Sequence, residues 1–230
     1  MSDLASHRPA LARVFWIGGA PDAGKTSVAT ALARRHGFPV YHFDRHELAH
    51  FTRATPELQP ALWAAHPDRM TTEERWLGAP PEELAAQTIA CWSERCLMAF
   101  DDLAAISGDG PIIAEGPGFF PQLVAPFLTD PRNAIWLIPD EAFKRRSALA
   151  RGKPGNRHET SDPNRATANL IARDLLMGAC IRRQCQALGL LAITITGAES
   201  IDAVVSRVEE RLSQWPRTPA RTGQQRGMCR

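Results

Sequence analysis

Residues 14–37, VFWIGGAPDAGKTSVATALARRHG, decide the fold. The stretch begins with an apolar run that ends in two glycines, as a buried parallel strand does. It closes with helix-forming residues, 26–36, and Gly37 is placed to terminate that helix. Between the two, residues 19–26 match the pattern GxxxxGK[ST] in full. The sequence therefore predicts a strand, a glycine-rich loop and a helix in immediate succession.

The residue types in this loop suit a phosphate-binding site. Gly19 and Gly24 permit positive φ angles, so that successive backbone N–H groups can point at phosphate oxygens. The following helix offers free N–H groups and the positive end of its dipole. We expect Lys25 to contact the β and γ phosphates of ATP and the Thr26 hydroxyl to ligate Mg²⁺. The predicted nucleotide-binding residues are Gly19, Ala20, Pro21, Asp22, Ala23, Gly24, Lys25, Thr26 and Ser27.

The rest of the chain alternates strand-like and helix-like segments. Further strands are expected at 40–43, 112–114, 134–138 and 191–195. The pattern predicts a three-layer α/β fold, with a five-stranded parallel sheet and helices on both faces, in one domain spanning 1–214. Residues 45–110 form a helical insertion that ends in a long helix, 81–106, and is placed to cover an acceptor. Residues 151–165 are polar and basic and lie between helices at 141–151 and 163–188, which suits a lid.

Composition excludes several classes of protein. The 230 residues are 44% hydrophobic and 23% charged, as in a folded globular protein rather than a disordered or fibrous one. No apolar run reaches the ~18 to 20 residues of a membrane helix, and the start lacks a signal-peptide pattern, so we expect a cytoplasmic protein without membrane contact. The five cysteines form no CxxC pair and are expected to be buried reduced thiols.

The charge balance argues against nucleic acid as a partner. The net charge is +2, and the tail at 215–230 holds four Arg and no acid. The 27 basic residues less those four leave 23 against 25 acidic residues in 1–214, so the folded part has no global basic field. We expect the basic tail to be disordered. The sequence is also compatible with a homodimer.

The loop and its context resemble the P-loop kinases of small molecules. This broad group holds nucleoside and nucleotide kinases, shikimate and gluconate kinases, chloramphenicol phosphotransferase and zeta toxins. Motif identity is confined to residues 19–27, with weaker similarity at Asp44, at Glu115-Gly116 and in the Arg-rich segment 145–173. The resemblance implies the P-loop nucleoside-triphosphate hydrolase fold, with ATP and Mg²⁺ as cofactors.

Asp44 and Glu115 follow strands at the edge where parallel sheets bind their ligands. Similarity to chloramphenicol phosphotransferase and shikimate kinase implies that Asp44 orients the acceptor hydroxyl and accepts its proton. A helix-capping pair of Asp44 with Glu47 is the alternative. Glu115 is assigned either to Mg²⁺ or to the substrate, and Gly116 to a turn that passes close to the substrate.

Histidines and tryptophans near the expected site have two interpretations each. His42, His46 and His50 recur every four residues, which is compatible with zinc. However, His42 belongs to a strand and points elsewhere, and phosphoryl transfer uses Mg²⁺ with oxygen ligands, so we assign His46 to the acceptor pocket. The tryptophans of the insertion are core residues or stack on a planar acceptor. They are Trp63, Trp76 and Trp92.

Basic residues crowd around the expected lid, where Arg donors would stabilise the charge on the transferring phosphoryl group. They are Arg145, Arg146, Arg151, Lys153, Arg157, Arg165 and Arg173. We expect Arg151, Arg157 and Arg173 to be catalytic.

These observations predict an ATP- and Mg²⁺-dependent kinase acting on a hydroxyl of a small molecule such as a metabolite, nucleoside or antibiotic. One alternative is a nucleoside monophosphate kinase, in which Arg53, Arg69 and Arg75 would hold the acceptor phosphate. Another is a regulatory NTPase that passes a conformational change to a partner. A polynucleotide end kinase would require residues 216–230. No motif in 45–110 identifies the acceptor.

Overall fold

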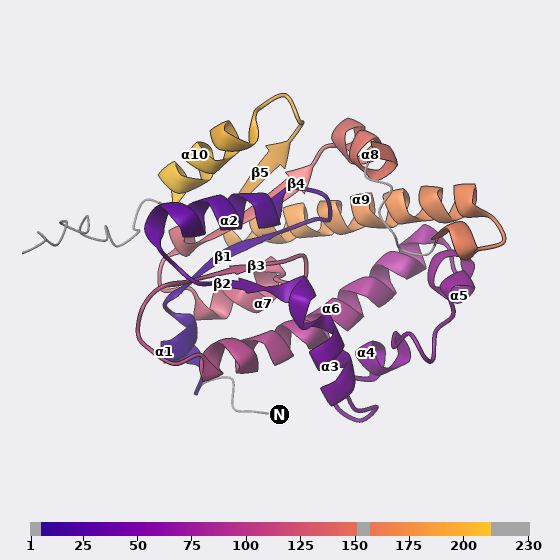
Figure 1. Ribbon diagram of the computed structural model, residues 1–230, viewed down its shortest axis with the longest axis horizontal. Coiled ribbons are helices and arrows are strands. Elements are labelled where there is room, and N and C mark those ends of the chain that lie inside the picture. The colour runs from indigo at the N-terminus through magenta and orange to yellow at the C-terminus, as the bar shows by residue number, and fades with distance from the viewer. Residues whose placement is uncertain (1–5, 151–156, 213–230) are drawn as a thin grey trace, which may run out of the picture.

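The computed structural model describes residues 6–150 and 157–212 (Figure 1). Its strands are β1 (Val14–Gly19), β2 (Val40–His42), β3 (Ile112–Glu115), β4 (Ala134–Pro139) and β5 (Leu191–Ile195). They form a single sheet, and every strand pair in it is parallel. The expected α/β architecture, with five parallel strands, is confirmed.

Helices connect and cover these strands. The α-helices are α1 (Arg8–Leu11), α2 (Lys25–His36), α3 (Glu47–Arg53), α4 (Pro60–Ala64), α5 (Thr72–Leu77), α6 (Pro81–Ala105), α7 (Pro121–Val124), α8 (Glu141–Ala150), α9 (Pro163–Leu188) and α10 (Ile201–Arg211). Short 3₁₀ helices are η1 (Phe43–His46), η2 (Ala125–Phe127), η3 (Pro131–Asn133) and η4 (Arg157–Glu159). The long helix expected at 81–106 is thus confirmed to within one residue.

The strand order β2-β3-β1-β4-β5 places β1 at the centre of the sheet. After β1 the chain moves to β2 and β3 on one side and then crosses to β4 and β5 on the other. In open parallel sheets the crevice for ligands lies at the carboxyl ends of the strands, where the direction of winding reverses. Here that point is the end of β1, next to Glu115, which pairs with Ile17 in the parallel register.

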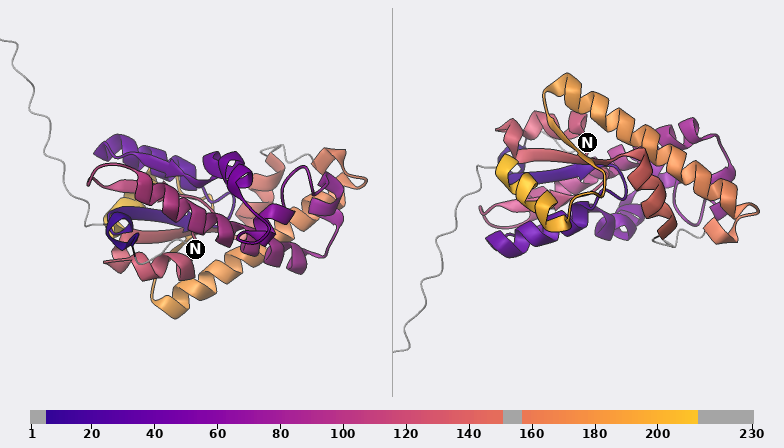
Figure 2. Two further views of the ribbon diagram at one scale, coloured as in Figure 1. Left: turned by 90° about the horizontal axis from the view of Figure 1, so that it is seen from below. Right: turned by 90° about the horizontal axis from the view of Figure 1, so that it is seen from above.

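Alternate residues of β1 face opposite layers of the molecule. Phe15 and Ile17 pack with the core under α2 and α10, whereas Val14 and Trp16 pack with the core under α6 and α9. Figure 2 shows α2 and α9 on opposite sides of the sheet. Because both faces are covered, a continuous apolar strand is stable at the centre of the sheet.

The expected insertion, 45–110, folds into α3, α4, α5 and α6 and has a small apolar core of its own. Phe51, Leu62, Cys91 and Met98 are buried in that core. The insertion packs on α9 through α5 and α6. Hydrogen bonds add to this packing: Asn169 of α9 donates to the Trp76 carbonyl, and Ser161, which precedes α9, donates to the Glu73 carboxylate.

One expectation changes on the structure. Phe43 was expected to complete β2, with Asp44 directly after the strand, but β2 ends at His42 and both residues lie in η1, where Arg95 binds the Phe43 carbonyl and helps hold the turn. Of the expected lid, only residues from 157 onward are described, so Arg151 and Lys153 lie outside the described residues, as does the tail at 215–230.

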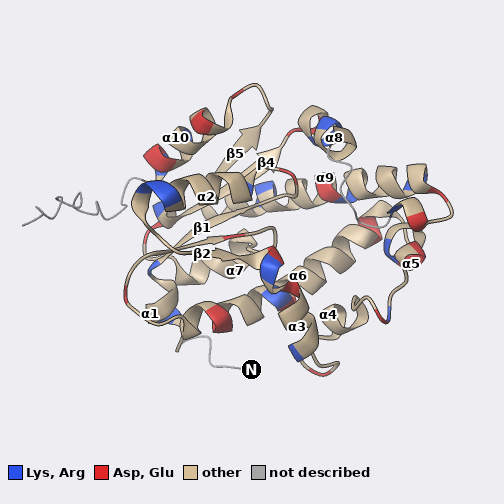
Figure 3. Ribbon diagram, viewed as in Figure 1, with Lys and Arg blue, Asp and Glu red and all other residues tan. Residues whose placement is uncertain are grey.

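Three further features of the structure correspond to expectations from composition: the absence of a membrane-spanning helix among the described residues, the distribution of charge, and the state of the cysteines. No helix among the described residues is long and apolar enough to cross a membrane. Basic and acidic positions are interspersed over the helices (Figure 3), without a layer of one sign. Cys91, Cys96, Cys180 and Cys185 are free thiols, and all but the half-buried Cys180 are buried. The expected burial is confirmed for Cys91, Cys96 and Cys185.

Candidate active site

The glycine-rich loop, residues 19–26, turns tightly between β1 and α2. Gly19, Asp22 and Gly24 all have positive φ angles, of 127°, 65° and 80°. A Cβ on Gly19 would lie 2.0 Å from the Leu137 carbonyl oxygen, so this position also needs glycine for close packing on β4. A backbone in which residues of positive φ alternate with others directs successive N–H groups into a concave array that binds anions.

A cavity of about 340 Å³ opens over this loop, and we call it the loop cavity. The loop and the first turn of α2 contribute Pro21, Asp22, Gly24, Lys25, Thr26 and Ser27 to its lining. Since α2 begins at Lys25, the N–H groups of its first turn and the positive end of its dipole lie at this wall. Lys25 is buried, and its ammonium donates to the Ala20 carbonyl oxygen at 2.7 Å.

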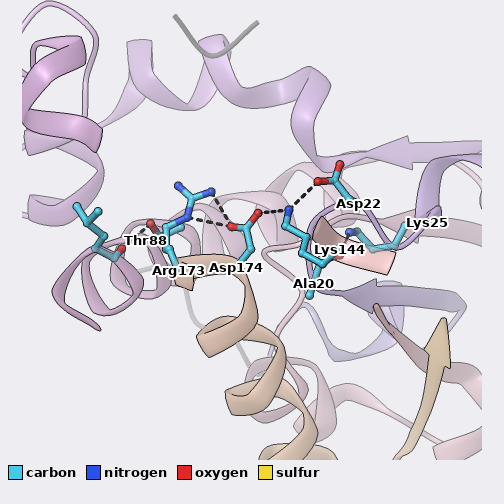
Figure 4. Close-up of polar contacts among 8 residues, drawn as sticks. Ala20, Asp22, Lys25, Thr88, Lys144, Arg173 and Asp174 are labelled. Carbon is cyan, nitrogen blue, oxygen red and sulfur yellow. Dashed lines mark hydrogen bonds and ion pairs between the residues drawn. The ribbon is translucent and has the colours of Figure 1, made fainter. Parts of the chain in front are cut away.

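A buried ion cluster holds the loop, and Asp22, Arg173 and Asp174 of this cluster also line the loop cavity. Lys144 of α8 is fully buried, and its ammonium lies 2.6 Å from an Asp22 oxygen and in contact with Asp174 of α9. Arg173 donates twice to the other oxygen of Asp174, at 2.7 and 2.9 Å. Figure 4 shows Lys144 between the two carboxylates. The two cations of this cluster balance the charge of its two carboxylates, as buried charges require. The cluster also holds Asp22 in its unusual conformation with a positive φ.

Thr26, the last residue of the glycine-rich loop, lies beside Glu115, the last residue of β3. The Thr26 hydroxyl donates to Glu115 Oε1 at 3.1 Å, and His42 Nδ1 lies 2.7 Å from the same oxygen. Glu115 is buried and lines the loop cavity. A hydroxyl and a carboxylate are the hard oxygen donors that Mg²⁺ prefers, so these two residues fit that ion.

Asp44 lines the same cavity and is exposed within it. The N-cap of α3 is His46, without a side-chain cap, and Glu47 pairs instead with the buried Arg95 at 3.0 Å. The capping alternative for Asp44 is therefore wrong. Within the described residues its carboxylate has neither a hydrogen bond nor an ion pair.

Arg157 and Arg173 reach the loop cavity from the lid side. Their guanidinium carbons lie 5.7 and 5.0 Å from the ring centre of Trp76. The face of an aromatic ring attracts a guanidinium, so Trp76 helps to hold both side chains at the cavity. Together with Lys25, these residues place three cations around the cavity.

A second cavity, of about 480 Å³, adjoins the first and lies within the insertion. We call it the insertion chamber. Its apolar wall includes Phe51, Met70, Trp76, Leu84, Cys91 and Trp92. Trp76, Trp92 and Arg173 line both cavities. Burial raises the pKa of Cys91 to about 11, so its thiol stays protonated at neutral pH and acts as part of the apolar wall.

Of the residues assigned to the substrate from sequence, His46 and Gly116 do not line either cavity, and of the predicted nucleotide-binding residues Gly19, Ala20 and Ala23 do not. His46 stacks on Tyr41, with ring centres 4.2 Å apart, beside the Asp102 carboxylate. Gly116 packs on Phe43, where an added Cβ would come within 2.2 Å of the Phe43 Cβ. As expected, His42 is separate from the other two histidines: it contacts Glu115, whereas His46 and His50 lie beside Asp102. Among the described residues, no three His, Cys, Asp or Glu side chains gather as a metal site would need.

Lys144 and Asp174 were not recognised as site residues from sequence. A signal was present: Asp174 interrupts an apolar stripe in α9 formed by Ile171, Met177 and Ile181, all of which are buried. A carboxylate on a buried stripe requires a cation, and only the fold shows that this cation is Lys144.

Comparisons with known proteins add little on function. No protein-family model matches the chain, and none of the curated proteins matches it in sequence. Among solved structures, it is similar to an uncharacterized protein from Eubacterium ventriosum ATCC 27560, with 13% identity, a TM-score of 0.42, and coverage of 89% of this chain and 99% of that one. It is also similar to TT1252 from Thermus thermophilus, with 19% identity, a TM-score of 0.49, and coverage of 86% and 97%.

Proposed function

We propose that the chain is an ATP- and Mg²⁺-dependent phosphotransferase that transfers the γ-phosphoryl group to a hydroxyl of a small molecule. One observation carries the proposal: Lys25, at the start of α2, and the exposed carboxylate of Asp44, which has no partner among residues 6–150 and 157–212, line the same cavity. The Lys25 ammonium is suited to bind a phosphate, and the Asp44 carboxylate is suited to accept the proton of a hydroxyl. Phosphoryl transfer to an alcohol needs both functions.

Each group then has a distinct part in the reaction. The acceptor oxygen forms the new bond to phosphorus, the bond to the leaving ADP oxygen breaks, and the hydroxyl proton passes to Asp44. Lys25, Arg157 and Arg173 would stabilise charge on the transferring group. Thr26 and Glu115 would hold Mg²⁺, which neutralises phosphate charge. The walls of the two cavities would exclude water and so limit hydrolysis.

The positions of three arginines favour an alcohol over a phosphate acceptor. Arg53 pairs with Asp102 at 2.8 Å, and Arg69 lies over the Trp63 ring at 3.4 Å. Neither lines the loop cavity or the insertion chamber. Arg75 lines the chamber, but its guanidinium donates to the Ala65 carbonyl at 2.9 Å. The nucleoside monophosphate kinase alternative therefore lacks its expected phosphate clamp.

A coupled assay of ADP release tests the proposal. The protein is mixed with Mg²⁺ and ATP, alone and with a panel of alcohols, sugars and nucleosides. We expect release that depends on an alcohol acceptor, together with a phosphorylated product by mass spectrometry. Release at one rate with every acceptor would support the regulatory NTPase and contradict the phosphotransferase.

A further inference from the structure

The insertion chamber restricts the chemistry of the acceptor. Its wall is formed mainly by apolar side chains from α3, α4, α5 and α6, with two indole rings, Trp76 and Trp92, at the junction with the loop cavity. A volume of about 480 Å³ suits a molecule of one or two rings. Apolar surface buried against such walls contributes about 25 cal/mol per Å².

The charged groups of the chamber argue against a phosphorylated acceptor. Glu47 receives a hydrogen bond from Arg95 at 3.0 Å, yet its side chain is 54% exposed and would repel a phosphate. Arg75 donates to a backbone carbonyl, and Arg173 lies at the junction with the loop cavity, where the proposed reaction uses it for the transferring group. A phosphate dianion needs cations and N–H donors aimed at it, and this lining offers few.

The junction between the insertion chamber and the loop cavity determines the orientation of the acceptor. Trp76, Trp92 and Arg173 border both cavities, so a molecule in the chamber has one end at the cavity that holds Asp44 and Lys25. On the basis of the proposed function, we infer that the chamber binds the flat apolar body of an alcohol without phosphate, such as an aryl alcohol, with its hydroxyl directed toward Asp44.

Fluorine NMR on the full chain tests this inference with three probes. They are para-fluorobenzyl alcohol, fluorodeoxyglucose and fluorouridine monophosphate. We expect line broadening of the aryl alcohol and much weaker broadening of the other two. Stronger binding of the sugar or the nucleotide, or no binding of the aryl alcohol at millimolar concentration, would overturn the inference.

Two neighbouring exposed positions of α6 provide a matched pair of variants. Gln87 lines the chamber and Ala86 does not. Gln87→Trp should fill the chamber and weaken aryl alcohol binding about tenfold or more, whereas Ala86→Trp should leave it unchanged. Thermal melting of both variants checks that they are folded. Equal binding by the two variants would place the probe outside the chamber and contradict the inference.

Lys25→Ala separates this inference from the proposed function. The variant should lose ATP binding and keep aryl alcohol binding. If the wild-type protein binds the aryl alcohol but not ATP, the phosphotransferase fails and the chamber assignment stands. If it binds ATP and phosphorylates only sugars or nucleotides, the chamber assignment fails.

Discussion

At the scale of single residues, Asp44 and Lys25 have contrasting environments in the loop cavity. Asp44 is exposed and has no partner among the described residues, whereas Lys25 is buried and bonded to the loop backbone. A carboxylate without a structural partner contributes little to folding, so its loss should affect the chemistry alone. This contrast makes the two residues suitable for separate tests.

Asp44→Asn should lower kcat by roughly 10² to 10⁴ with little change in ATP affinity, because the amide can orient the hydroxyl but cannot accept its proton. Steady-state kinetics with an identified acceptor measure this. The control is Asp109→Asn, an exposed carboxylate outside both cavities. A variant that only melts earlier, with normal kcat, would show a structural role for Asp44.

Lys25→Ala should reduce phosphoryl transfer by several orders of magnitude and leave the fold intact, because the loop is also anchored through Asp22. Arg34→Ala, which removes an exposed cation from the same helix, should have near-normal activity. Near-normal transfer by Lys25→Ala itself would remove the loop from the mechanism.

At the scale of elements, Lys144 joins α8, α9 and the glycine-rich loop. Lys144→Met should lower the free energy of unfolding by about 3 to 5 kcal/mol, because it leaves Asp22 and Asp174 buried with less positive charge. Urea unfolding measures this. The matched control, Arg145→Ala, breaks an exposed pair with Glu141 and should cost about 0.5 kcal/mol. Equal effects from the two variants would contradict the anchoring role.

Asp102 docks the insertion onto the sheet. It accepts hydrogen bonds from Tyr41 and Arg53, both at 2.8 Å, and lies 2.9 Å from His50 Nε2. Burial alone would raise the pKa of this carboxyl, but the bonds from His50, Tyr41 and Arg53 hold the pKa well below its ordinary value. A lowered folded-state pKa means that the ionised form stabilises the fold at neutral pH. That contribution disappears as pH falls below about 4, toward the folded-state pKa.

Asp102→Asn should therefore lower the free energy of unfolding at neutral pH by about 1 to 3 kcal/mol. The gap between the variant and the wild type should narrow as pH falls below about 4. Denaturant titrations across this range test both statements. Asp101→Asn, at the half-exposed neighbouring position, is the control. A gap that stays constant with pH would argue against an ionised Asp102 in the folded protein.

The elements could be predicted from sequence because their signals are local. The apolar run of β1, the helix stop at Gly37 and the long amphipathic pattern of α6 each depend on neighbouring residues, and the structure has all three. Lys144, Arg95 and the insertion chamber could not be predicted, because their roles depend on residues brought together from distant segments. His46 shows the same limit: its spacing pointed to the site, but its ring stacks on Tyr41.

At the scale of the whole molecule, the two cavities meet where the sheet reverses its winding and the insertion joins α9. The loop cavity depends on β1, β3 and α2, and the chamber depends on α3, α4, α5 and α6. Trp76 and Arg173 belong to both, so nucleotide and acceptor sites would share a wall. The central claim is that the glycine-rich loop binds the triphosphate of a nucleotide.

Isothermal titration calorimetry of ATP with Mg²⁺ tests this claim most directly. The account predicts binding of one nucleotide per chain by the wild-type protein, a large loss of affinity in Lys25→Ala, and unchanged affinity in Arg34→Ala. No detectable binding at millimolar nucleotide, or equal affinity in all three proteins, would contradict it.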